Sequence, residues 1–354
     1  MPPANPLLGI GFHAIGALFA SVCYTPQKKV SGWSWQSYWM VQASFCWLLL
    51  PLAGAWLTIP RLGEVLAAAP RGPMAFSFLL GAAYGVGGTA FGISIRHIGF
   101  SLTYAIAIGL STVLGTIIPP LVAGTLGETL SKTGAGWVVG GIAIGMLGIA
   151  FTGLAGRMKE RDLSAQADLG AFSLMTGLLL SLLAGVLSAV YGFSLAAGEP
   201  IAETASRFGA GVFRGNVIYI FSNAGAFLSA SAYCLWLHHR HRTLGEIVEL
   251  PAGPERSGLP VNWAMAALTG LLWYGQFFFY NLGHVRMGAY KFASWAIHMI
   301  MLILFSILVG WMLREWQKSR PLTKGVLALA FFVLLGSVLA ITHGNHLGET
   351  TGAH

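Results

Sequence analysis

The sequence predicts an all-α membrane protein with ten transmembrane helices in two inverted five-helix repeats. Three observations predict this fold: the composition, a series of long apolar segments, and a charged segment that divides the series in half. Of the 354 residues, 55% are hydrophobic and only 9% are charged, and the mean hydropathy is +0.70. A soluble domain carries about 25% charged residues, and a disordered chain combines low hydrophobicity with high charge. Both classes are therefore excluded.

Other function classes are excluded by what the sequence lacks. The net charge of +8 is not gathered into a basic stripe among exposed aromatic residues, so we expect no nucleic-acid partner. Three cysteines do not make a disulfide scaffold, and no Cys or His spacing predicts a metal site. Membrane enzymes need a nucleophile–base pair, paired aspartates or a metal set, and none of their motifs occurs. We therefore expect no enzyme activity and no cofactor.

The first five apolar segments follow from the length rule, since a helix needs about 20 mostly apolar residues to cross the hydrocarbon core. The residues before the first segment, Met1–Asn5, carry no basic side chain, so this segment predicts a membrane helix rather than a cleavable signal. Short loops rich in Gly, Pro, Arg and Lys separate the segments. The five are Pro6–Thr25, Ser37–Ile59, Pro73–Ile95, Ser101–Ala123 and Gly136–Gly156.

The last five segments follow the same rule after the most charged short linker, which begins Arg157-Met-Lys-Glu-Arg-Asp162. They are Gly170–Ala197, Gly215–Leu237, Asn262–Gly283, Tyr290–Met312 and Thr323–Thr342. We therefore predict a first repeat over 1–156, a cytoplasmic linker over 157–169 and a second repeat over 170–354. An odd number of crossings in each half gives the halves opposite orientations, as inverted repeats require.

The distribution of basic residues predicts the orientation. Most of the 20 Lys and Arg residues, among them Lys28, Arg157 and Arg240, fall in the first, third, fifth, seventh and ninth loops. The positive-inside rule makes these loops cytoplasmic. Both termini are then predicted to lie outside the cytoplasm.

Glycines on the fifth segment form a small-residue face, which lets helix backbones approach closely in a membrane. Two interpretations stay open: the face packs within the chain, or it forms the seam of a homodimer. The face comprises Gly136, Gly140, Gly141, Gly145 and Gly148.

Several motifs resemble known transporters. A Pro-bearing span, a terminal Glu and a Gly-led helix, as in Pro119-Pro120, Glu128 and Gly136, are similar to the drug/metabolite transporter superfamily, whose members have ten spans in two inverted repeats. Longer stretches resemble the bacterial L-rhamnose–proton symporters, and the resemblance runs almost from end to end. These stretches are Tyr24–Val30, Trp33–Trp35, Gly99–Gly109, Trp273–Tyr280, Gly283-His284, Ser294-Trp295, His298-Met299 and Glu315-Trp316. The resemblance implies a sugar–proton symporter of the inner membrane.

The residues themselves predict an uncharged cargo. None of the 12 acidic residues falls near the middle of a segment, although a lipophilic cation would need a buried carboxylate partner. The eighth segment instead places Trp273, Gln276 and Tyr280 on one helix face, because they are spaced i, i+3 and i+7. Amide and phenol groups pair with sugar hydroxyls, and aromatic rings cover the apolar C–H faces. The alternative is that the aromatics pack internally or face lipid.

Further candidate sugar-binding residues share a face or a stripe with these. Tyr274 and Asn281 occupy the neighbouring stripe of the eighth segment, and Trp295 lies on the ninth. Tyr24 continues a stripe of the first segment that reaches Gln27.

Two intramembrane histidines, His13 and His298, are the candidate proton sites. Histidine titrates near pH 6.5, so it takes up and releases a proton without extreme tuning. Glu203, in the sixth loop, is a weaker alternative. The competing interpretation of each histidine is a neutral imidazole that donates one hydrogen bond to a carbonyl.

Two transport functions remain. The first is a proton-coupled importer of a small neutral sugar, L-rhamnose or a related 6-deoxy sugar, working by alternating access. The second is an uncoupled metabolite exporter or exchanger of the same architecture, which the missing mid-span carboxylates and Lys291 favour.

Overall fold

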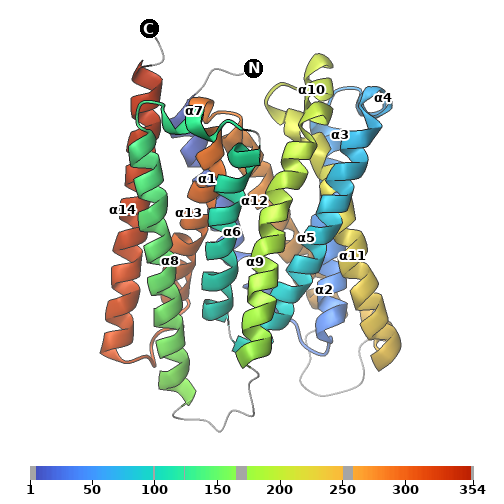
Figure 1. Ribbon diagram of the computed structural model, residues 1–354. Coiled ribbons are helices and arrows are strands. Elements are labelled where there is room, and N and C mark those ends of the chain that lie inside the picture. The colour runs from blue at the N-terminus through green and yellow to red at the C-terminus, as the bar shows by residue number, and fades with distance from the viewer. Residues whose placement is uncertain (1–4, 99, 123, 165–173, 250–257, 352–354) are drawn as a thin grey trace. The chain divides into compact units, whose positions relative to one another are not determined.

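The computed structural model describes residues 5–98, 100–122, 124–164, 174–249 and 258–351 (Figure 1). Within these residues every regular element is helical. The chain divides into two compact units. The described parts of unit 1 lie within 22–86 and 193–281, and those of unit 2 lie within 2–21, 87–192 and 282–354. Each unit takes residues from both halves of the chain, so this division differs from one at the charged segment, and the five-plus-five repeat stays a prediction.

Unit 1 is built from an interrupted second span and the helices around it. The elements that lie within it are η1 (Pro26–Lys29), α2 (Trp35–Ala43), η2 (Ser44–Leu49), α3 (Leu50–Thr58), α4 (Leu62–Ala68), α10 (Glu199–Arg207), η3 (Gly211–Val217), α11 (Ile218–His241) and η4 (Leu244–Ile247). Helix η2 is a π-helix, and η1, η3 and η4 are 3₁₀-helices.

Unit 2 contains the longest helices. Its elements are α6 (Phe100–Val122), α7 (Leu126–Leu130), α8 (Ala135–Ser164), η5 (Gly288–Ala293), α13 (Ser294–Met312), α14 (Pro321–Thr351) and nearly all of α1 (Pro6–Val22). Helices α5 (Arg71–Ile98), α9 (Leu174–Ala197) and α12 (Leu259–His284) contribute residues to both units.

Helix occupies all the predicted apolar segments, with shifted ends. Helix α1 stops at Val22, three residues before the predicted end at Thr25. The predicted linker 157–169 begins as helix, because α8 continues to Ser164. Its residues 165–169 lie outside the described residues, as do Ala123 and residues 170–173, which were predicted to belong to the fourth and sixth segments.

In the described part of the chain, nine helical segments are long and apolar enough to cross a membrane. Helix α12, which matches the eighth predicted segment, is not among them. It is 26 residues long, but it carries Asn, Gln, Trp and Tyr side chains that lower its hydropathy. The structure therefore supports an all-α membrane protein, while the count of ten spans stays a prediction.

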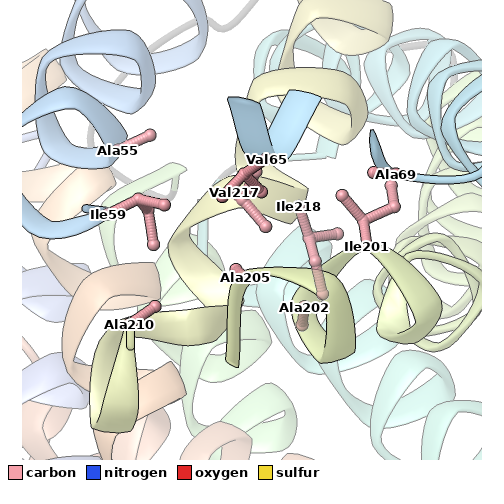
Figure 2. Close-up of a cluster of buried hydrophobic side chains, with 10 residues drawn as sticks. All are labelled: Ala55, Ile59, Val65, Ala69, Ile201, Ala202, Ala205, Ala210, Val217 and Ile218. Carbon is pink, nitrogen blue, oxygen red and sulfur yellow. The ribbon is translucent and has the colours of Figure 1, made fainter. Parts of the chain in front are cut away.

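Short helices that the apolar-segment rule does not detect form a core at one end of unit 1 (Figure 2). Ile201 and Ala205 are four residues apart on α10, and both are completely buried. They pack in one cluster with Val65 of α4 and with Val217 and Ile218, where η3 meets α11. Burial of apolar area stabilises these short helices, because a helix of this length is unstable alone.

Helices α8 and α14 run side by side in unit 2 (Figure 1). A Cβ atom on Gly141 would lie 2.7 Å from Cγ1 of Ile341, and one on Gly148 would lie 2.6 Å from Cγ of Leu334. The Ser337 hydroxyl donates to the Gly141 carbonyl at 2.6 Å. Glycine is therefore required where the two backbones approach.

The other glycines of the predicted small-residue face differ among themselves. A Cβ atom on Gly145 would also strike Ser337, at 2.7 Å from its hydroxyl oxygen. Gly136 and Gly140 have nothing within 4 Å of such an atom. Internal packing thus explains the glycines at 141, 145 and 148. For Gly136 and Gly140 both interpretations, internal packing and a homodimer seam, remain.

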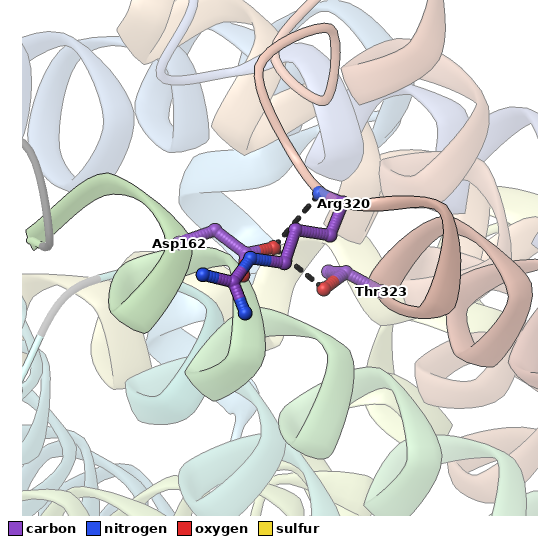
Figure 3. A network of polar contacts seen from close by, with 3 residues as sticks. All are labelled: Asp162, Arg320 and Thr323. Carbon is purple, nitrogen blue, oxygen red and sulfur yellow. Dashed lines mark hydrogen bonds and ion pairs between the residues drawn. The ribbon is translucent and has the colours of Figure 1, made fainter.

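Asp162, near the end of α8, caps the beginning of α14 (Figure 3). Its Oδ2 atom accepts the backbone N–H of Arg320 at 2.9 Å and the hydroxyl of Thr323 at 2.7 Å. An anion at a helix N-terminus satisfies free backbone donors and the helix dipole. The Arg320 side chain is 75% exposed, so its ion pair with Asp162 adds little stability. The cap fixes how the fifth predicted span meets the tenth.

Candidate functional site

Trp273 of α12 lies at the centre of an aromatic cluster in unit 1. Its ring centroid is 5.3 Å from that of Tyr24, 5.9 Å from that of Trp39 and 5.5 Å from that of Trp47. All three contacts are edge-to-face, the arrangement that aromatic quadrupoles favour. The structure therefore brings together Tyr24 and Trp273, two predicted sugar-binding residues.

Helix α12 is held against the second span by a hydrogen bond and by a glycine. The Tyr38 hydroxyl donates to Thr269 Oγ1 at 2.6 Å. One residue later, a Cβ atom on Gly270 would lie 3.0 Å from the carbonyl oxygen of Gln42 and 3.1 Å from the backbone nitrogen of Cys46. Glycine at 270 thus permits the close approach that places Trp273, one turn further on, among the aromatic rings.

The predicted residues of the neighbouring α12 stripe pack elsewhere in unit 1. Tyr274 lies against Gly54, with its ring 6.3 Å from that of Tyr219. The Asn281 amide donates to Asn216 Oδ1 at 3.5 Å. The Asn216 amide in turn donates to Thr58 Oγ1 at 3.0 Å. This chain of amides binds α12 to η3 and α3.

Three further predicted residues of unit 1 are enclosed to different degrees. Gln276 and Tyr280 are 7% and 8% exposed, which excludes full exposure to lipid in either case. Gln27, in η1, is half-buried.

Two site residues that sequence spacing does not predict are Trp39 and Trp47. Both are almost completely buried, at 2% and 1% exposure, and their rings complete the cluster around Trp273. The only signal was the density of Trp in the second segment, which is equally typical of interfacial anchors. Their role depends on the contact between α2 and α12, which sequence spacing does not reveal.

The two candidate proton sites, His13 and His298, are in contact in unit 2. Their ring centroids are 5.7 Å apart in an edge-to-face arrangement, and the side chains are 0% and 1% exposed. A Cβ atom on Gly283 would lie 2.9 Å from His13 Nε2, so glycine is needed where α12 passes α1. His284, the next residue, is close enough for its charge to act on His13.

Trp295, one helical turn before His298 on α13, is held by α6. Its indole N–H donates to the Ser111 carbonyl at 3.1 Å and lies 3.3 Å from the Ser111 hydroxyl. A Cβ atom on Gly115 would lie 2.6 Å from the same nitrogen. Trp295 therefore belongs to a tightly packed contact within unit 2.

Glu203 is the third candidate proton site. It is an exposed residue of α10 in unit 1, whereas the histidines belong to unit 2. In the part of the chain that the structure describes, no three His, Cys, Asp or Glu residues gather to hold a metal ion.

A carboxylate from the loop after α11 holds the first turn of α2 in unit 1. Glu246 Oε2 accepts the Ser34 backbone N–H and the Ser37 hydroxyl, each at 2.7 Å. Burial alone would raise the pKa of Glu246, but these hydrogen bonds favour the charged form, and the pKa is lowered overall. The Gln36 amide also donates to Thr243 Oγ1 at 2.8 Å. These bonds tie the start of the second span to the loop.

These features define a class of protein before any comparison. The described chain is helical, nine of its helical segments can cross a membrane, and those segments enclose polar and aromatic side chains. It is a multi-pass membrane protein with the make-up of a transporter. Residues 4–347 match the family model of the L-rhamnose-proton symport protein, RhaT. The chain belongs to this family, which is a family of transporters and not of enzymes.

Individual relatives agree with the family match. The L-rhamnose-proton symporter of Mannheimia succiniciproducens is 32% identical over 341 residues, covering 93% of this chain and 95% of the relative. The L-rhamnose-proton symporters of Yersinia pestis and Yersinia pseudotuberculosis are each 31% identical over 332 residues, with the same coverage.

Proposed function

We propose that this protein imports L-rhamnose, or a related 6-deoxy sugar, together with protons across the bacterial inner membrane. The observation that carries the proposal is the family match over residues 4–347, together with relatives named L-rhamnose-proton symporters along almost their whole length. The same names disfavour an uncoupled exporter. The sugar and the proton are the cargo, and the proposal includes no cofactor.

The aromatic cluster of unit 1 supports sugar binding. A 6-deoxy sugar has apolar C–H faces and a methyl group, which the rings of Tyr24 and Trp273 suit. The remaining hydroxyls need hydrogen-bond partners, for which Gln276, Tyr280 and Asn281 offer amide and phenol groups. Each of the three is at most 8% exposed.

The histidine pair of unit 2 supports proton coupling. Two charged imidazoles 5.7 Å apart would repel by about 3 kcal/mol at an effective dielectric constant of about 20. The pair would therefore hold one proton rather than two. That proton would bias the equilibrium between outward-open and inward-open states, because it has different affinities for them.

The proposed topology adds α12 to the nine apolar helical segments of the described residues, as the eighth of ten spans in chain order. The five spans of 1–156 and the five of 170–354 would then have opposite orientations and move against each other during alternating access. Both termini would be periplasmic. Gly136 and Gly140, which have open space beside them, are where a homodimer seam would form.

Proton movement with the sugar tests the proposal directly. Adding L-rhamnose to de-energised cells that express the protein should alkalinise a weakly buffered medium, because each sugar entering takes a proton with it. A pH electrode records the change, and cells without the protein are the control. An uncoupled exchanger would move labelled sugar with no change in pH, and that result would refute coupling.

A further inference from the structure

Gln42 of α2 carries a buried amide with no partner among the described residues. The side chain is 0% exposed, and within the described ranges neither Oε1 nor Nε2 has a hydrogen-bond partner. An amide in an apolar environment costs several kcal/mol when its hydrogen bonds are missing. An unpaired amide in a membrane span therefore indicates a functional role rather than a stabilising one.

The helix changes its winding directly after Gln42. Residues Ser44–Leu49 form a π-helix, in which the Leu50 N–H donates to the Phe45 carbonyl five residues earlier. Pro51 follows and has no N–H to donate, so regular α-helical bonding is interrupted at this point. Short π-helices are frequent at functional sites, because they re-aim side chains.

Two indole N–H groups, one within this segment and one on α2 before it, also lack a partner among the described residues. They belong to Trp39 and Trp47, whose ring centroids are 6.5 Å apart. Both rings contact Trp273 of α12. Gly270 brings the α12 backbone against Gln42 itself. The N–H groups of Trp39 and Trp47 and the Gln42 amide thus lie in one small region of unit 1. The same region holds the Trp273 ring, which the proposed function assigns to sugar binding.

We propose that Gln42 is a sugar-binding residue that hydrogen-bonds a hydroxyl group of the sugar. The Trp39 and Trp47 N–H groups donate to further hydroxyls. This inference rests on the proposed function and extends the binding site from α12 to the second span. The amide both donates and accepts, so it can pair with two adjacent hydroxyls of a pyranose ring.

The test compares Gln42→Leu with the unaltered full-length protein, purified in nanodiscs. Calorimetric titration with L-rhamnose should show affinity reduced by about 10- to 100-fold, the effect of losing one or two buried hydrogen bonds. The thermal midpoint of the sugar-free variant should rise, because an unpaired amide has been removed. A residue with only a structural role would lower the midpoint instead.

Gln36→Leu is the matched control on the same helix. Gln36 is also buried, at 7% exposure, but its amide is already bonded to Thr243. This variant should keep the sugar affinity and lose thermal stability. If Gln42→Leu does not fold, Gln42→Asn, which keeps the amide on a shorter side chain, should still reduce the affinity.

Singly deoxygenated L-rhamnose analogues identify the contact. The loss caused by Gln42→Leu should vanish for the analogue that lacks the bound hydroxyl and persist for the others. Unchanged affinity of Gln42→Leu for L-rhamnose, or an equal loss with every analogue, overturns the inference. Failure of the unaltered protein to bind L-rhamnose overturns the proposed function itself, and this inference with it.

Discussion

His13 and His298 come from opposite ends of the chain, yet their rings meet in the interior of unit 2. Replacing His298 by alanine should abolish sugar accumulation driven by a pH gradient, because the proposed proton site loses one imidazole. Counterflow exchange of labelled for unlabelled sugar should persist in part, since it requires sugar binding without net proton movement. Both rates are measured in proteoliposomes.

His343→Ala provides the control for that experiment. His343 is an exposed residue of α14 whose ring lies 5.0 Å from that of Trp137. Its replacement should change neither rate. Proton-driven accumulation that is unaltered in His298→Ala would remove His298 from the mechanism.

Single residues also show where sequence reasoning about the site succeeds. A histidine or an amide inside an apolar segment is costly, so His13, His298 and Gln276 were conspicuous without a structure. Gln42 carries the same signal, but the sequence alone does not connect it to the polar face of the eighth segment. Its backbone carbonyl lies against Gly270, and Trp39 on the same helix contacts Trp273; both partners are far away in the sequence, and only folding brings these segments together. The roles of all these residues remain predictions.

At the scale of whole elements, the packing of α8 on α14 gives a sharp contrast between two glycines. Gly145→Leu should destabilise the protein by about 1–3 kcal/mol, because the new side chain overpacks against Ile300 and Ser337. Gly140→Leu should have little effect on the folding stability of the single chain, since that position has nothing within 4 Å in it. Thermal unfolding in detergent measures both variants, and an equal loss for the two would contradict the packing described here.

The elements also divide into those the sequence could predict and those it could not. Long apolar stretches locate the spans, because the bilayer sets their length. Helices α4, α7 and α10 are five to nine residues long, too short for that rule. The π-helix depends on local competition between hydrogen bonds near Pro51. The charged stretch after Gly156 is helical because α8 extends beyond its apolar part.

For the molecule as a whole, the charge distribution predicts that both termini are periplasmic. Alkaline phosphatase fused to the C-terminus should then be active, because it folds only after export, and green fluorescent protein fused there should be dark. Fusions after His241, in the predicted cytoplasmic seventh loop, should give the opposite result. A fluorescent C-terminal fusion would refute the proposed orientation.

Hydropathy predicts the class of fold, because the bilayer requires each span by itself to be apolar. It did not determine which spans pack together. Each compact unit takes segments from both halves of the chain, and such contacts depend on how closely the facing surfaces fit, as where Gly270 approaches the backbone carbonyl of Gln42. The identity of the sugar comes from the family resemblance. Composition alone restricts the cargo only to a small uncharged solute.

The contacts of Glu246 couple the second span to the seventh loop during any movement of either. Its carboxylate accepts the Ser34 N–H at the start of α2, where free backbone donors favour an anion, and the Trp33 indole donates to its backbone carbonyl at 2.6 Å. The second span therefore cannot rotate or shift relative to the seventh loop unless these hydrogen bonds break. During transport we expect this end of unit 1 to move as one rigid body. Protonation of the carboxylate, whose pKa is lowered by its hydrogen bonds, should weaken the contact in acid.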